Sequence, residues 1–262
     1  MARRVPEGPP PPPIVQRVRL RYTKRGRLRF TSHRDFARAF ERALRRAEVP
    51  MAYSAGFHPH PKISYLGAAP TGVASEAEYV EIALAVEVDV ELLRSRIDQA
   101  LPDGLDVIEA VSAGPGSLAE RMQASHWRLE LAGISEIEVA AAVQAFLAED
   151  EVTVERLTKD GRRMLDARAA VVSAVVSSGG SPVVSPGSER HDDVTRAILD
   201  LVVRQVTPAV RPDDVLTALR NVAGLALEVP PVAVRVAQGP LDDAGEVGDP
   251  LIHDRASAGT TP

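Results

Sequence analysis

The feature that most constrains the fold is the strict alternation of residues 15–22, VQRVRLRY, and the helical pattern that follows it. Val18 and Leu20 fall on one side of an extended chain and arginines fall on the other, which is typical of a strand with one buried face. An amphipathic helix is predicted over about residues 33–48, with Ser32 as its N-cap. A chain that opens with this strand and this helix must build a sheet with helices packed against it.

The following patterns complete one β-α-β-β-α-β unit. Residues 51–66 are predicted to be extended, 76–88 to form a strand, 89–101 a helix and 105–111 a last strand. This order is that of the ferredoxin-like fold. The second half gives a similar order: strand 125–133, helix 135–149, hairpin 151–176, helices 192–206 and 211–221, and strand 229–239.

These patterns predict an α+β protein built from two tandem ferredoxin-like (β-α-β-β-α-β) domains. Residues 1–14 are expected to be a disordered Pro-rich N-terminal segment. The basic first domain is predicted over 15–115 and the second domain over 124–240. Residues 241–262, rich in Gly, Asp and Ala, are expected to form a disordered C-terminal tail.

Composition removes several classes of function. The chain has no cysteine, which excludes disulfides, thiolate zinc sites and a thiol nucleophile. The lack of cysteine also fits a cytoplasmic protein. No apolar run approaches the roughly 20 residues that a membrane-spanning helix needs, so no membrane contact is expected. No glycine spacing matches a phosphate-binding or dinucleotide-binding motif, and no cofactor is predicted. Residues 1–66 hold 15 Lys and Arg against 4 Asp and Glu, a charge of +11, whereas the remaining residues carry −16. This asymmetry indicates either an anionic partner or mutual neutralisation of the two halves.

The arginines of the basic segment are the first candidate site. Few acidic residues interleave them, and Arg neutralises phosphate backbones and binds phosphate through two parallel hydrogen bonds. We therefore favour an RNA-binding surface over an ordinary solvated face. Its predicted members are Arg17, Arg19, Arg21, Arg29, Arg34, Arg38 and Arg42.

The stretch GFHPHPK, residues 56–62, is the second candidate site. His58 and His60 project to one side of an extended chain, yet two histidines without cysteine make a weak zinc site, and no metal is predicted. The prolines stiffen the loop, so Phe57, His58, His60 and Lys62 could contact a base or a phosphate. A purely structural turn and acid–base catalysis by His60 stay open as alternatives.

The residues 17–82 also resemble a known family. RLRFTSHRDFARAFERALRRAEVPMAYSAGFHPHPKISYL and the later SEAEY are similar to the pattern of a radical-SAM-linked family of uncharacterised bacterial proteins. The resemblance implies work on RNA or ribosomes beside a radical SAM protein or a ribonuclease E/G-type partner. Many relatives have Asn where this chain has His58, which leaves His60 and Lys62 as the stronger candidates.

The expected function is therefore a non-catalytic RNA-binding module that acts with a radical SAM protein or a ribonuclease in RNA or ribosome-related processing or modification. Without cysteine, the chain itself cannot hold the cluster of a radical enzyme. One alternative is an RNA-processing or RNA-modifying enzyme that uses His60. A second alternative is a protein–protein adaptor with a basic docking face.

Overall fold

The alternating segment at the start of the chain forms strand β1 (Gln16–Lys24) in a computed structural model that describes residues 12–158, 161–179 and 195–258. The chain divides into two units. Unit 1 comprises residues 1–121 together with 249–262, and unit 2 comprises residues 122–248. The predicted N-terminal segment 1–14 lies mostly outside the described residues. The α+β class is confirmed in both units.

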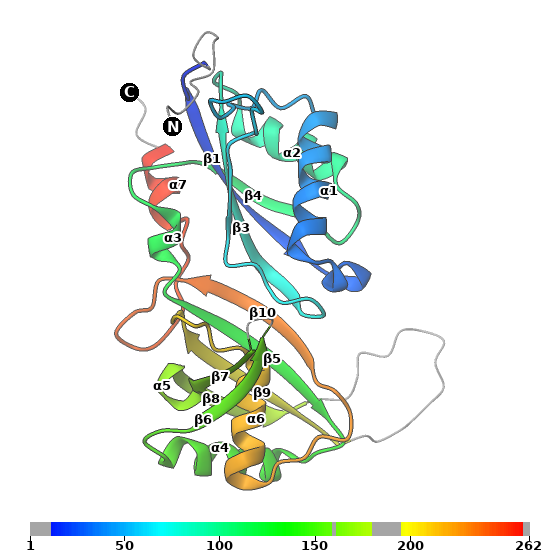
Figure 1. The fold of residues 1–262 in the computed structure, drawn as a ribbon, viewed down its shortest axis with the longest axis vertical. Helices are drawn as coiled ribbons and strands as arrows, with labels where there is room; N and C mark the ends of the chain where they lie inside the picture. The colour runs from blue at the N-terminus through cyan, green and yellow to red at the C-terminus, as the bar shows by residue number, and fades with distance from the viewer. Residues whose placement is uncertain (1–11, 159–160, 180–194, 259–262) are drawn as a thin grey trace. The chain divides into compact units, whose positions relative to one another are not determined.

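Unit 1 contains one antiparallel sheet whose strands lie in the order β4-β1-β3-β2. Helices α1 and α2 lie along one side of these strands, and α3 and α7 lie on the other (Figure 1). The elements are β1, the 3₁₀ helix η1 (Gly26–Phe30), α1 (His33–Arg46), β2 (Ile63–Leu66), β3 (Ala74–Leu84), α2 (Val90–Ala100), β4 (Val107–Ser112), α3 (Leu118–Arg121) and α7 (Ile252–Ala258).

The core of unit 1 lies between its sheet and α1 and α2. Leu20 and Tyr22 point from β1 toward α1, where the Tyr22 and Phe36 rings stack with 4.4 Å between their centroids. The predicted cap of α1 is confirmed, because the Ser32 hydroxyl oxygen accepts a hydrogen bond from the Asp35 N–H. With its apolar face buried in this way, α1 presents its arginines to solvent.

In unit 2, antiparallel strands lie in the order β10-β5-β9-β8, and β6 and β7 form a separate two-stranded sheet. Trp127, Leu129 and Leu131 of β5 are buried, while residues between them, such as Arg128, are exposed or half-buried. The elements are β5 (Ala124–Ala132), α4 (Glu136–Ala148), β6 (Thr153–Thr158), β7 (Gly161–Asp166), α5 (Ala167–Ala170), β8 (Val171–Ser178), β9 (Arg196–Arg204), α6 (Pro212–Ala223) and β10 (Val232–Gly239).

The helix predicted over 192–206 was wrong. Within that range, residues 196–204 form strand β9, which pairs with both β5 and β8. Ala197, Leu199, Leu201 and Val203 alternate and are all buried. The apolar Ile198 and Val202 between them blur the period of two, so the local pattern also fits a helix. Pairing with strands distant in the sequence decides the outcome.

The tail predicted to be disordered over 241–262 also differs from the structure as far as residue 258, and residues 259–262 lie outside the described ranges. Leu241 pairs with Val247 in an isolated bridge, and α7 follows as part of unit 1. Leu251 and Asp254 have no solvent exposure. The partners that hold this segment lie more than a hundred residues earlier in the chain, so its composition alone gives no sign of order.

Candidate nucleic-acid interface

The arginines of β1 lie on the sheet face opposite α1 and are engaged within unit 1. Arg19 pairs in register with Glu81 of β3, and its Nε donates a hydrogen bond to Glu81 Oε2 at 2.9 Å. The Arg17 Nη1 lies 3.1 Å from the other oxygen of the same carboxylate. The Arg21 Nε donates to the main-chain oxygen of Glu76 at 3.0 Å. Arg19 is only 2% exposed, whereas Arg17 is exposed and Arg21 half-buried, so the three predicted residues differ in how open they are to a ligand.

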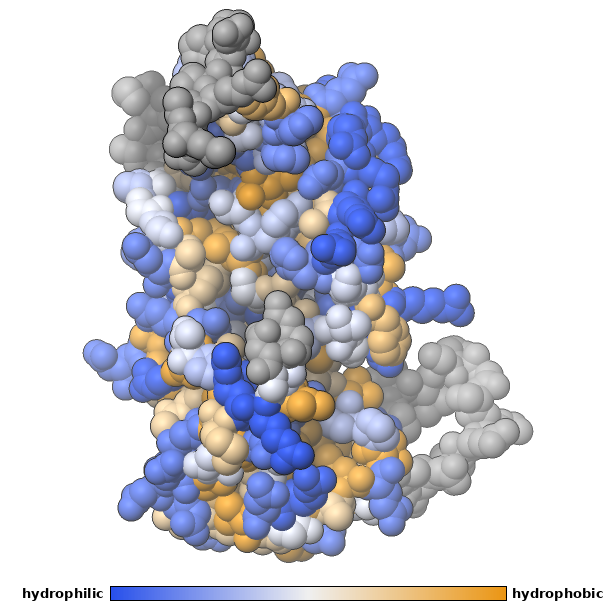
Figure 2. Space-filling model, in the orientation of Figure 1, coloured by the Kyte–Doolittle hydropathy of each residue, from blue (hydrophilic) through white to orange (hydrophobic). Residues whose placement is uncertain are grey.

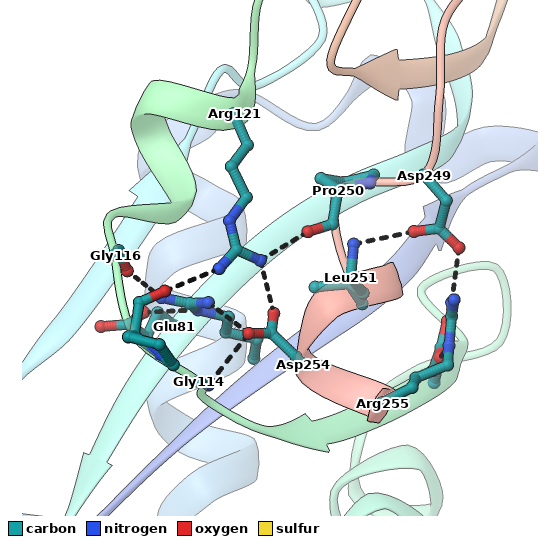
Figure 3. Close-up of polar contacts among 12 residues, drawn as sticks. Glu81, Gly114, Gly116, Arg121, Asp249, Pro250, Leu251, Asp254 and Arg255 are labelled. Carbon is teal, nitrogen blue, oxygen red and sulfur yellow. Dashed lines mark hydrogen bonds and ion pairs between the residues drawn. The ribbon is translucent and has the colours of Figure 1, made fainter. Parts of the chain in front are cut away.

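The second partner of Arg19 is Asp254 of α7, at the centre of the network in Figure 3. Asp254 Oδ1 accepts from Arg19 Nη1 at 2.7 Å and from the Gly114 N–H at 2.9 Å, and Oδ2 accepts from Arg121 Nη1 at 2.9 Å. Burial alone would raise the pKa of Asp254, but these hydrogen bonds outweigh it and hold the pKa below its ordinary value. Arg255 secures the other side of α7 by binding Glu109 and Asp249.

The arginines of α1 have the opposite environment. Arg34, Arg38 and Arg42 are exposed and lie one turn apart on the helix, and Arg45 continues the row. Among the residues that the structure describes, no carboxylate forms an ion pair with any of them. Hydrophilic surface gathers over α1 in Figure 2. This row, defined as Arg34, Arg38, Arg42 and Arg45, is the α1 arginine row.

Arg29 precedes α1 and differs from the row. It is half-buried and forms no ion pair in the described ranges, and its guanidinium lies over the Phe30 ring, 4.7 Å from the centroid. Its Nε is buried and has no hydrogen-bond partner in the part of the chain that the structure describes. Phe30 itself is 59% exposed. The pair places a cation and an open aromatic ring just before the helix.

The stretch GFHPHPK lies in an exposed loop after α1, which we call the 53–62 loop. Its ends are tied, since Tyr53 bridges Pro61 and the Ser54 N–H donates to the His60 carbonyl oxygen at 2.9 Å. The His60 N–H in turn donates to the Ser54 hydroxyl oxygen at 3.0 Å. Phe57, at the tip, is 65% exposed. The loop is therefore built by its own main chain and holds its side chains outward.

The predicted side chains of this loop, those of Phe57, His58, His60 and Lys62, are all exposed. No group of three or more His, Asp or Glu residues in the described ranges is placed to hold a metal ion. Within the same ranges no side chain holds the His60 ring, whereas a general base is normally oriented by a second group. Catalysis by His60 stays a prediction, without such an orienting partner here.

Two pockets were not foreseen from the sequence. One, of about 650 Å³ in unit 1, is lined by residues that include Arg17, Arg19, Glu81, Gly114 and Ser117. The other, of about 540 Å³ in unit 2, is lined by His126, Arg128 and Asp200 among others.

In the unit 2 pocket, His126 Nε2 lies 2.8 Å from Asp200 Oδ1.

The network around Asp254 in unit 1 was also not foreseen from the sequence. Asp254 and Arg121 are 133 positions apart in the chain, and no local motif marks either of them. Only the pairing of β1 with β3, read as Arg opposite Glu, could have indicated part of this network.

No helix in the described ranges is long and apolar enough to cross a membrane. No curated protein matches the chain. Residues 17–212 match the model of a family described as an uncharacterised protein conserved in bacteria, DUF2344. This match includes β1, α1 and the 53–62 loop, and it covers well over half of the chain. The chain therefore belongs to this bacterial family, DUF2344.

Proposed function

We propose that the protein is a cytoplasmic RNA-binding module, itself non-catalytic, that binds RNA with the α1 arginine row and the 53–62 loop. One observation carries the proposal: the row is exposed and has no carboxylate partner in the described residues, although the chain as a whole is acidic. A solvated structural face would normally interleave both signs of charge. Four arginines with no carboxylate partner in the described residues can neutralise phosphates, and the release of counterions from the phosphates favours that binding.

The spacing of the row supports a nucleic-acid backbone as the ligand. Successive arginines four residues apart are separated by roughly 6 Å along a helix axis, so the row can follow a chain of phosphates. The exposed rings of Phe30 and Phe57 come before and after α1 in the chain. Aromatic side chains beside a basic surface are typical of binding to single-stranded nucleic acid, whose bases can stack on them. Lys62 and His60 in the loop add hydrogen-bond donors.

The strand orders support the proposed ferredoxin-like assignment of both units. In unit 1, β4-β1-β3-β2 places the four strands of a β-α-β-β-α-β chain with the first and third at the centre. In unit 2, β10, β5, β9 and β8 take the same places, and β6, β7 and α5 are an insertion after α4. In unit 1 the two helices of this β-α-β-β-α-β order, α1 and α2, lie along the same side of the sheet (Figure 1), which leaves the outer face of α1 free to present charge.

The partner in this proposal is a radical SAM protein or a ribonuclease E/G-type enzyme. It rests on the resemblance of residues 17–82 to the radical-SAM-linked family and on the lack of cysteine in this chain. Because a cluster needs thiolate ligands, any such chemistry must come from the partner. The module would then hold the RNA while the partner acts on it.

RNA binding at two salt concentrations tests the proposal. An Arg34/Arg38/Arg42→Ala variant should bind a single-stranded RNA oligomer about 10-fold to 100-fold more weakly at low salt. This estimate assumes that each exposed ion pair with a phosphate contributes up to about 1 kcal/mol of binding free energy. Its log–log salt slope should fall by about two, since each phosphate contact contributes roughly 0.7. Fluorescence anisotropy measures both quantities.

The matched control is Arg163/Arg204/Arg220→Ala, which removes three exposed arginines of unit 2 and hence the same charge. It should change affinity far less. Equal losses in the two variants would show non-specific attraction and contradict the α1 site. Phe57→Ala should weaken binding with no change in salt slope, by about 1–3 kcal/mol if a base stacks on the ring.

A further inference from the structure

Helix α7 buries an acid where a packed helix normally buries apolar side chains. Of its side chains that the structure describes, those of residues 252–256, only that of Asp254 is buried. Ile252, the large apolar residue of this helix, is 55% exposed. Leu251, just before the helix, is the apolar anchor. Polar contacts to Asp254, more than apolar burial, therefore hold α7 against the sheet.

The groups around Asp254 form a receptor for an oxyanion. Two guanidinium groups, from Arg19 and Arg121, and the N–H of Gly114 all donate to one carboxylate. Figure 3 shows Arg121 pointing at Asp254. Guanidinium and main-chain N–H groups together are the donors that proteins use for phosphate. If the Asp254 carboxylate withdrew, Arg17 and Arg19 would keep their ion pairs with Glu81, and Arg121 would have no ion pair in the described residues. Three guanidinium groups and one carboxylate would leave a charge of about +2 at this place.

The donors are fixed by contacts that do not involve Asp254. Arg19 is held by Glu81 and by the carbonyl oxygen of Gly116, which accepts from Nη2 at 2.6 Å. Arg121 Nη2 donates to the Pro115 carbonyl oxygen at 2.9 Å. A receptor that keeps its geometry when its occupant leaves loses little entropy on binding a new one.

A pocket gives access to this receptor. Arg19 and Gly114 both contact Asp254 and both line the pocket of about 650 Å³ in unit 1, a volume within the usual range for ligand sites. Arg17, Ser64 and Ser117 line the same pocket, and Arg17 is exposed. A ligand seated there would meet Arg17 first and could extend an anionic group toward Arg19.

We propose that Arg19, Arg121 and the Gly114 N–H form a phosphate-binding site and that the Asp254 carboxylate of α7 occupies it until a phosphorylated ligand displaces the helix. The phosphate comes from a free phosphorylated compound or from an RNA chain. A ligand with one carboxylate would not suffice, because an intramolecular carboxylate acts at a high effective concentration. A phosphate group competes better because it carries more charge and more acceptor oxygens. This site is separate from the α1 arginine row.

A spin label on α7 tests the proposal in the full chain. The protein has no cysteine, so Ile252→Cys provides the sole thiol, at an exposed position. Inorganic pyrophosphate, or an RNA oligomer without terminal phosphates, should change the label's spectrum from immobile to mobile. Sodium acetate at equal ionic strength should not. Mobility with pyrophosphate assigns the site to free phosphorylated compounds and mobility with RNA alone assigns it to a nucleic-acid backbone. An immobile label with both ligands at saturation overturns the proposal.

Direct binding to variants provides the second measurement. Asp254→Asn keeps the shape of the side chain and removes its charge, so calorimetry should show pyrophosphate binding about tenfold tighter or more than to wild type, because the competing carboxylate is gone. Arg121→Gln in the same background should abolish that gain, and Arg94→Gln on α2 should not. Absence of tighter pyrophosphate binding in Asp254→Asn would contradict the proposal and would mean that Asp254 only stabilises the packing of α7. An Arg34/Arg38/Arg42→Ala variant should keep its pyrophosphate response, which separates this site from the RNA surface.

Discussion

The two arginine rows of unit 1 come from one basic stretch of sequence and reach opposite environments. The row on β1 meets the carboxylates of Glu81 and Asp254, and its central member, Arg19, is 2% exposed. The α1 arginine row meets solvent, with no carboxylate partner in the described residues. A count of basic residues cannot separate these outcomes. The two rows differ because β1 has neighbouring segments that supply carboxylates, whereas the outer face of α1 has none in the described residues.

The sheet explains the difference physically. In a sheet, a side chain lies beside the side chain directly opposite it on the paired strand. Glu81 of β3 is directly opposite Arg19 of β1. A helix that packs with one face leaves its other face without any neighbour. Buried arginines then act on the fold, and exposed ones are free to act on a ligand. The predictions below test this division, starting with the largest effect.

Arg19→Ala should destabilise unit 1 by about 3–5 kcal/mol, because it removes an ion-pair partner from the fully buried Asp254 carboxylate and from the half-buried Glu81 carboxylate. Arg17→Ala removes a contact to the same Glu81 carboxylate, but the Arg17 side chain is half-exposed, so we expect a loss of no more than about 1 kcal/mol. Urea unfolding of the two variants measures both values. Similar losses would mean that burial does not distinguish the two arginines.

Acid should weaken the same network. The pKa of Asp254 is held below its ordinary value by its hydrogen-bond donors, so its contribution to stability is fully present above its unfolded-state pKa of about 3.9. That contribution is lost as the pH falls through the lower folded-state pKa. The stability difference between wild type and Asp254→Asn should therefore be constant near neutral pH and shrink below about pH 4. Denaturant unfolding at a series of pH values measures it, and a difference that stays constant down to pH 3 would contradict the assignment.

Much of unit 1 could be predicted because its signals are local. The alternation in β1, the Ser32 cap and the burial of Phe36 and Phe40 all follow from neighbouring residues. The strand Arg196–Arg204 could not, because apolar residues on both of its faces leave the period ambiguous. Pairing with distant strands overrides local preference in such segments.

The candidate site divides in the same way. The exposure of Arg34, Arg38 and Arg42 follows from helical periodicity and was predictable. The burial of Arg19 was not, because Asp254 lies 235 positions later in the chain. When the partner of a residue lies far away in the sequence, the residues next to it give no sign that it will be buried. The sequence therefore indicates where charge accumulates but not which charges are already paired.

The smallest effect is expected for the α1 arginine row itself. Arg38→Ala removes a cation that lies one turn from both Arg34 and Arg42, which relieves like-charge repulsion of about 0.2–0.5 kcal/mol for each neighbour. Alanine is also the strongest helix former. The free energy of unfolding should therefore stay within about 0.5 kcal/mol of wild type or rise slightly, as is usual for exposed sites.

The same variant should nevertheless bind RNA more weakly, so one substitution separates folding from binding. Urea unfolding and RNA anisotropy on a single preparation give both numbers. A loss of stability above about 1.5 kcal/mol, well outside the range for exposed sites, would mean that Arg38 has a structural partner. The α1 row would then resemble the β1 row, and the charge on α1 would no longer support an RNA surface, because a paired arginine has no free charge to offer a phosphate.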